Sequence, residues 1–155
     1  MPSDGDDALR RLEPLVGTWS LEAVFPGQPP SADRGRLSFE WLPGGGYLVQ
    51  RWEVPVPEAP DGIAVIGWQA DRGTLLQHYF DNRGVARLYE MGFADGVWTL
   101  SRDEADFSPL AFRQRWRGVL AGDTIVGTWE IGTWETSHDG GTWEHDFELR
   151  YHRLG

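Results

Sequence analysis

The sequence is dominated by short stretches in which apolar and polar residues alternate, with turns containing Gly or Pro between most of them. Alternation with a period of two is typical of a β-strand that buries one face. No helical pattern of 10–15 residues separates the stretches, which disfavours a parallel βαβ fold. The expected fold class is all-β, an antiparallel up-and-down β-barrel of about ten strands with a short N-terminal helix. The expected strands are Thr18–Phe25, Arg36–Leu42, Tyr47–Val54, Gly62–Gln69, Thr74–Phe80, Val85–Phe93, Val97–Arg102, Leu110–Leu120, Thr124–Trp134 and Thr142–Arg153.

The stretch Leu12–Ala23 is expected to organise the fold. Gly17 allows a sharp turn just before the first strand, and the large indole of Trp19 can then plug one end of a barrel. Leu9 and Leu12 are spaced as on one or two helical turns, which Pro14 would stop. We therefore expect residues 1–7 to be a disordered tail and residues 8–155 to form a single domain.

Composition excludes several function classes. The chain has 155 residues, of which 40% are hydrophobic, and this is enough for one domain with a real core. Its net charge of −10 disfavours binding to nucleic acids and to anionic membrane surfaces. The chain lacks cysteine and lysine, which excludes thiol chemistry, Schiff-base catalysis and a P-loop. The acidic beginning of the chain does not resemble a signal peptide, so a cytoplasmic location is expected.

The order of the strands resembles that of the calycins, the superfamily of β-barrels that includes the lipocalins and the fatty-acid-binding proteins. The residues that carry this resemblance are Gly17 and Trp19 on the first strand and an Arg near the end of the last, either Arg150 or Arg153. In lipocalins such an Arg packs over the Trp. A group of bacterial calycin-like domains is more similar, through Gly67-Trp68-Gln69-Ala70-Asp71, His78-Tyr79-Phe80-Asp81 and Trp143-Glu144-His145-Asp146-Phe147. The resemblance covers nearly the whole chain and implies a barrel that holds a small molecule.

A more distant resemblance is to the nitrobindins, which are haem-binding barrels. Their haem ligand is a His on the last strand, and the corresponding position here is Asp146, with His145 one residue away. Strict alternation would place Trp143, His145 and Phe147 on the inward face. An inward His145 could contact a ligand, coordinate haem or a metal, or simply be a structural His bonded to a neighbour. The four His residues lack the spacing of a metal site, so no metal and no resident cofactor are expected.

Several other polar and aromatic residues are candidates for lining a pocket. Gln77 and Tyr79 share one face of their strand, but both faces are mixed, so that they either point into the barrel or lie outside. Arg87 and Tyr89 share a face with Val85 and Met91, and an inward Arg would need a counter-ion, which a ligand carboxylate can supply. The alternative is an outward Arg in a surface ion pair. Trp129, in one of four Gly-Thr-Trp triplets, is the sixth candidate, together with His145, Tyr79, Gln77, Arg87 and Tyr89.

The sequence therefore predicts a barrel that binds a small apolar or aromatic molecule. Haem binding through His145 is one alternative, and a small isomerase or hydrolase-like enzyme in the barrel pocket is another. No acid and base stand at a diagnostic spacing, so no catalytic residue is assigned and an activity as an enzyme is not favoured. A non-enzymatic homodimer formed by pairing of barrel edges is the remaining possibility.

Overall fold

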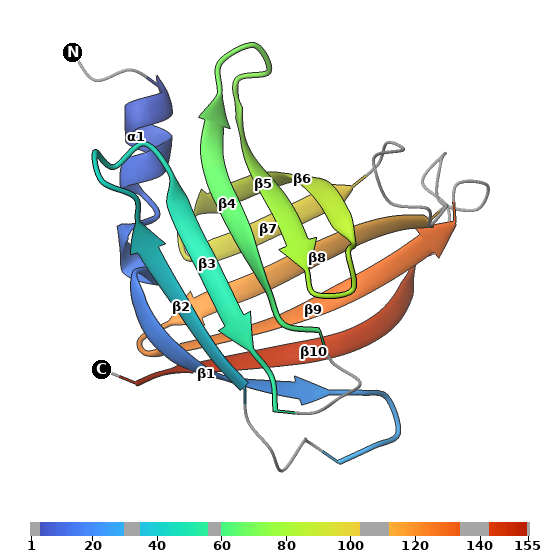
Figure 1. Cartoon of the computed structure of the whole chain (residues 1–155). Helices are drawn as coiled ribbons and strands as arrows, with labels where there is room; N and C mark the ends of the chain where they lie inside the picture. Colours follow the sequence, from blue (N-terminus) through green and yellow to red (C-terminus); the bar gives the residue numbers. More distant parts are fainter. Residues whose placement is uncertain (1–3, 30–34, 56–59, 103–111, 134–142, 155) are drawn as a thin grey trace.

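The computed structural model describes residues 4–29, 35–55, 60–102, 112–133 and 143–154, and these form a barrel of antiparallel strands preceded by a short helix (Figure 1). The helix α1 (Asp4–Arg10) and the 3-10 helix η1 (Glu13–Leu15) come first. Ten strands follow: β1 (Gly17–Val24), β2 (Gly35–Trp41), β3 (Leu48–Glu53), β4 (Gly62–Gln69), β5 (Thr74–Asp81), β6 (Ala86–Ala94), β7 (Val97–Arg102), β8 (Phe112–Ala121), β9 (Thr124–Thr133) and β10 (Glu144–Arg153).

The barrel is closed, as the alternation of the sequence predicts. Each strand pairs with its neighbours in the chain, and β1 pairs with β10 from Trp19–Arg153 to Val24–Glu148. Closure gives every described strand a neighbour on both sides, although parts such as the first four residues of β6 pair on one side only. The homodimer formed by pairing of edges stays a prediction.

The two ends of the barrel differ in their connections. Strands β1, β3, β5, β7 and β9 finish at one end, which we call the loop end. Helix α1 packs against β4 and β5 at the opposite end, which we call the helix end (Figure 1). Inward and outward side chains alternate along each strand, so the register fixes which residues meet inside.

A few contacts anchor the helical segment over the helix end. Leu12, Leu15 and Trp19 have no exposed surface, and the indole Nε1 of Trp19 donates a hydrogen bond to the Leu15 carbonyl at 2.9 Å. The guanidinium of Arg153 lies 4.2 Å from the centre of the Trp19 ring. It donates to the carbonyls of Val16 at 2.9 Å and Pro14 at 2.6 Å. Of the two arginines expected to cover Trp19, Arg153 is the one that does so.

The beginning of the chain differs from the expected tail. The helix α1 begins at Asp4, so residues 4–7 are helical, and Pro14 lies inside η1 instead of ending a helix. The reason is a tertiary contact: Gly5 is buried directly against the indole of Trp68 on β4, at a distance that leaves no room for a Cβ atom. Within the described residues, no helix has the length and apolar character needed to cross a membrane.

Candidate functional site

The inward side chains differ in their chemistry between the two ends. At the helix end, Trp19, Leu48 and Ile66 are completely buried. Near the loop end, four residues pair in register with other inward-facing residues but remain partly exposed: Trp52, Tyr79, Arg87 and Trp129. At the helix end the inward-facing Trp41 and Trp68 are also partly exposed, so the polar groups among the inward side chains are what distinguish the loop end, which we call the mouth.

Aromatic rings run from this mouth into the interior. Trp52 stacks on Tyr79 with 5.3 Å between ring centroids, and Tyr79 meets Tyr89 edge to face at 6.3 Å. Tyr89 in turn contacts Trp129 at 5.6 Å, and Trp129 contacts the buried Trp116 at the same distance. Rings in such contact present apolar faces and a few polar atoms to anything that enters.

Below the mouth lies a belt of buried polar side chains, which we call the polar belt and which consists of Gln50, Gln77, Tyr89, Arg102 and Gln114. The hydroxyl of Tyr89 donates a hydrogen bond to Oε1 of Gln114 at 3.0 Å. The Oε1 atoms of Gln50 and Gln77 are buried and have no hydrogen-bond partner among the described residues. Since buried polar atoms in folded proteins are nearly always paired, the belt has hydrogen-bonding capacity that the chain itself does not use.

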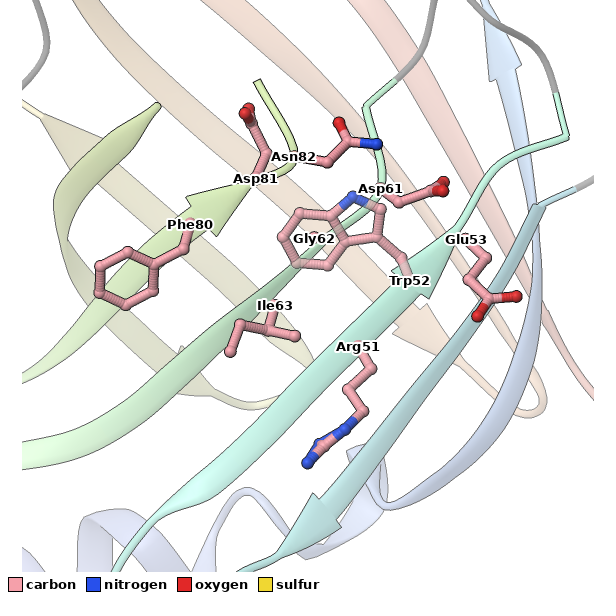
Figure 2. Close-up of a pocket in the computed structure, with 9 residues that line it drawn as sticks. All are labelled: Arg51, Trp52, Glu53, Asp61, Gly62, Ile63, Phe80, Asp81 and Asn82. Carbon is pink, nitrogen blue, oxygen red and sulfur yellow. The ribbon is translucent and has the colours of Figure 1, made fainter. Parts of the chain in front are cut away.

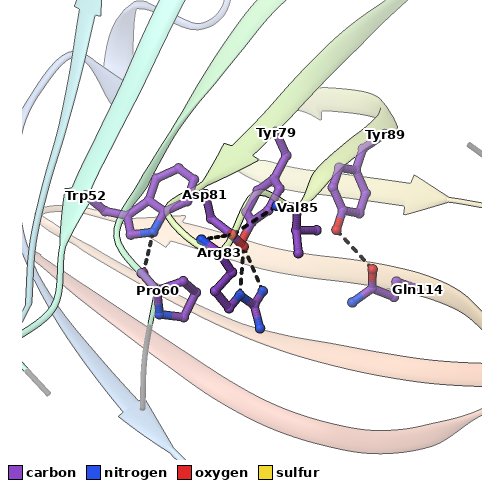
Figure 3. A network of polar contacts seen from close by, with 8 residues as sticks. All are labelled: Trp52, Pro60, Tyr79, Asp81, Arg83, Val85, Tyr89 and Gln114. Atoms are coloured by element: carbon purple, nitrogen blue, oxygen red, sulfur yellow. Dashed lines mark hydrogen bonds and ion pairs between the residues drawn. The ribbon is translucent and has the colours of Figure 1, made fainter. Parts of the chain in front are cut away.

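The last residue of β5, Asp81, holds the rim of the mouth together (Figure 3). Its carboxylate accepts hydrogen bonds from the hydroxyl of Tyr79 at 2.7 Å and from the guanidinium of Arg83 at 2.7 Å. Burial acts to raise the pKa of Asp81, but the hydrogen bonds from Arg83 and Tyr79 outweigh it and lower the pKa to about 2. Burial, and then the bond to Asp81, raises the pKa of Tyr79, so this phenol stays protonated at neutral pH.

An open groove of about 450 Å³ lies beside the rim, at the loop ends of β3, β4 and β5 (Figure 2). It follows two neighbouring register rows, the inward row of Trp52, Gly62 and Asp81 and the outward row of Arg51, Ile63 and Phe80. Ile63 and Phe80 are exposed on the outer wall. A second open hollow lies at the helix end between α1 and Trp41.

Five of the six predicted site residues lie together at or below the mouth: Gln77, Tyr79, Arg87, Tyr89 and Trp129. The face of β5 that carries Gln77 and Tyr79 is the inward one, which decides the choice that the sequence left open. The sequence analysis missed Gln50, Trp52 and Arg102. Gln50 and Trp52 alternate with Leu48 on one face of β3, and this pattern could have placed them with the core.

His145, the sixth predicted residue, does not face the interior, and the expectation that it shares a face with Phe147 is wrong. The register of β10 shifts between these two residues: Phe147 pairs with Trp129 on the inward row, whereas His145 pairs with Glu130. One extra residue in a strand sends the preceding side chains to the opposite face, so His145 is exposed on the outer wall. His78 and His152 also lie between inward neighbours on their strands and therefore face outward.

A metal-ion site gains no ligand set from the residues that the structure describes. Among them, no group of three or more His, Asp or Glu side chains converges in a way that could hold a metal ion. His138 lies outside the described residues. The interior of the described barrel thus offers amides, phenols, indoles and guanidinium groups, which bind organic molecules by hydrogen bonding, stacking and charge.

Comparison of the sequence with models of known protein families and with curated proteins found no match.

Proposed function

We propose that this protein binds a small aromatic or largely apolar molecule inside its barrel, through the mouth at the loop end. The observation that carries the proposal is the contrast in the inward side chains, which are apolar around Trp19 at the helix end but include amide, phenol and guanidinium groups toward the loop end. Polar groups inside a closed barrel lower stability unless something pairs with them, so their concentration near one open end favours a binding role.

Two features suit such a ligand. The rings of Trp52, Tyr79 and Trp129 can cover its apolar faces, and burial of about 200 Å² of apolar surface would contribute about 5 kcal/mol before the cost of association. The guanidinium of Arg87 lies 5.7 Å from the centre of the Tyr79 ring and adds positive charge near the mouth. This charge favours a ligand with an electron-rich or acidic end.

The same features support a place for this chain among the calycin-like proteins, which we propose as its relationship. The fold is a closed antiparallel barrel with one helix-covered end. Arg153 packs over Trp19 at that end, on the first and last strands, as the resemblance implied. These features concern the sealed end, while the binding residues lie at the other, so the relationship and the ligand are separate proposals.

The test is a titration with 1-anilinonaphthalene-8-sulfonate, an aromatic dye whose fluorescence rises in apolar surroundings. We expect saturable binding, weakened about tenfold or more by Trp52→Ala because the ring that stacks on Tyr79 is lost. The binding of candidate metabolites is then measured by their displacement of the dye.

The matched control is Trp41→Ala. Trp41 and Trp52 are both partly buried, and each donates its indole hydrogen, to Glu13 at 2.7 Å and to the Pro60 carbonyl at 3.0 Å respectively. They lie at opposite ends of the barrel, so Trp41→Ala should leave dye binding unchanged. Equal losses in the two variants, or no saturable binding to the folded protein, would contradict the proposal.

A further inference from the structure

Three Gln side chains of the described residues point into the barrel, and they differ in how their oxygens are used. Gln114 accepts a hydrogen bond from Tyr89. Gln50 and Gln77 are 6% and 4% exposed, and the Oε1 atom of each is buried without a partner in the described part of the chain. An amide oxygen in this state is a hydrogen-bond acceptor that can still pair with a donor.

The two unpaired acceptors are placed on either side of one strand. Gln50 on β3 pairs in register with Ala64 on β4, and Gln77 on β5 pairs with Ile66, two residues further along β4. Strands β3 and β5 are separated by two strand spacings, about 10 Å. Ala64 is completely buried, and its side chain is shorter than those of Gln50, Ile66 and Gln77 around it.

We infer that the ligand of this barrel is a flat molecule with at least one N–H or O–H group, which donates to Gln50 or Gln77 above Ala64. This inference rests on the proposed binding function and narrows it: a pure hydrocarbon chain would bury both amide oxygens and pair with neither. The aromatic rings at the mouth supply the stacking surface, and the two amides select for the donor.

The charge and protonation of the surroundings agree with this assignment. The hydroxyl of Tyr89 donates its hydrogen bond to Gln114, and the hydroxyl of Tyr79 donates its hydrogen bond to Asp81. Neither phenol is therefore available to satisfy Gln50 or Gln77 while those bonds persist. No donor of the described chain pairs with the two amide oxygens in this structure, so a ligand or water can supply one, and the experiment separates these two sources.

The experiment uses indole and benzofuran, which have nearly the same shape and differ in that N–H is replaced by an oxygen atom. Both are titrated into the ¹⁵N-labelled protein and followed in its ¹H–¹⁵N spectrum. We expect indole to bind about tenfold more tightly, the amount typical of one hydrogen bond to a buried neutral acceptor. If water satisfies the two amides instead, the affinities will be equal and the inference is overturned, while the proposed binding function stands.

Variants assign the preference to individual residues. Gln77→Met and Gln50→Met preserve length and remove the acceptor, and one or both should bring the ratio of the two affinities close to one. The controls are His78→Met and Arg51→Met, their outward-facing neighbours, which should leave the ratio unchanged. A ratio that survives in both Gln variants overturns the inference. If neither probe binds although the dye does, the inference fails alone; if nothing binds, the proposed function fails as well.

Discussion

The helix end and the loop end of the barrel are built from the same strands but use their inward positions for different purposes. Around Trp19, the inward residues Leu37, Leu48 and Ile66 are apolar and almost completely buried, although Ile66 pairs in register with Gln77 on β5. Around Tyr89, the inward residues include Gln77 and other polar groups, and several near the mouth remain partly exposed. The comparison teaches that apolar burial, which stabilises the fold, is concentrated at one end, while the other end keeps groups that stability alone would replace.

The largest effect should follow from opening the sealed end. Trp19→Ala removes a completely buried indole and its hydrogen bond to Leu15, and should lower the free energy of unfolding by about 4 kcal/mol. Trp129→Ala, at the partly exposed mouth, should cost about 2 kcal/mol because less surface is lost. Urea unfolding of the two variants measures the difference. Equal costs would mean that the two ends do not differ in packing.

A second test concerns the two arginines at the end of the chain. Arg153→Ala removes the cation over Trp19 and the hydrogen bonds to Val16 and Pro14, and should cost about 2 kcal/mol. Arg150→Ala removes only a partly exposed ion pair with Glu148 and should cost about 0.5 kcal/mol or less. Thermal unfolding at equal protein concentration distinguishes them, and a larger loss for the Arg150 variant would contradict this view of the helix end.

The predictability of the two ends also differs. The closed barrel follows from alternation and turn residues, and the resemblance predicts that Arg150 or Arg153 covers Trp19, of which the structure shows Arg153. The inward face of β5 could not be predicted, because Leu75, Gln77 and Tyr79 are no more apolar than Leu76, His78 and Phe80 on the other face. Only pairing with β4 and β6 decides between them.

Two further features depend on long-range contacts that a local pattern does not contain. The start of α1 depends on Gly5 meeting Trp68, far along the chain. The apolar and polar residues of β10 alternate regularly in the sequence, but the bulge interrupts this alternation. His145 therefore lies on the face opposite to the one that its sequence position predicts. The sequence identified most of the mouth residues, but it could not identify Gln50 and Gln77 as unpaired, because that depends on what the barrel brings near them.

A third test uses acid to loosen the rim of the mouth. The pKa of Asp81 is about 2 in the folded protein and about 3.8 without its partners. The folded state therefore gains stability from this carboxylate above pH 4 and loses it as the pH falls from about 4 to about 2. We expect a contribution of about 1 kcal/mol after screening by solvent, since Arg83 is half exposed.

The check is urea unfolding at pH 7 and at pH 3 of the unaltered protein and of Asp81→Asn. The variant should be less stable at pH 7 and should lose less stability on acidification. An unchanged loss on acidification would show that Asp81 does not hold the rim. Tyr79→Phe, which removes one of the bonds to Asp81, should behave in between.

The smallest effect expected is a gain. Gln77→Met removes an unpaired buried amide and should raise the free energy of unfolding by up to about 1 kcal/mol. Gln114→Met is the matched variant: it deprives the Tyr89 hydroxyl of its acceptor and should lower stability by about 1 kcal/mol. Chemical unfolding of both variants shows whether each substitution raises or lowers the free energy of unfolding. A loss of stability on Gln77→Met would indicate a structural role for this side chain.

The most direct test of an open binding mouth opposite a sealed end is a titration of the ¹⁵N-labelled protein with 1-anilinonaphthalene-8-sulfonate, observed at the indole N–H signals of its nine Trp residues. The account predicts progressive, saturable shifts of the Trp52 and Trp129 signals, while those of Trp19 and Trp41 remain in place. Shifts of Trp19 and Trp41 without shifts of Trp52 and Trp129, or a saturated titration that moves none of the four, would contradict it.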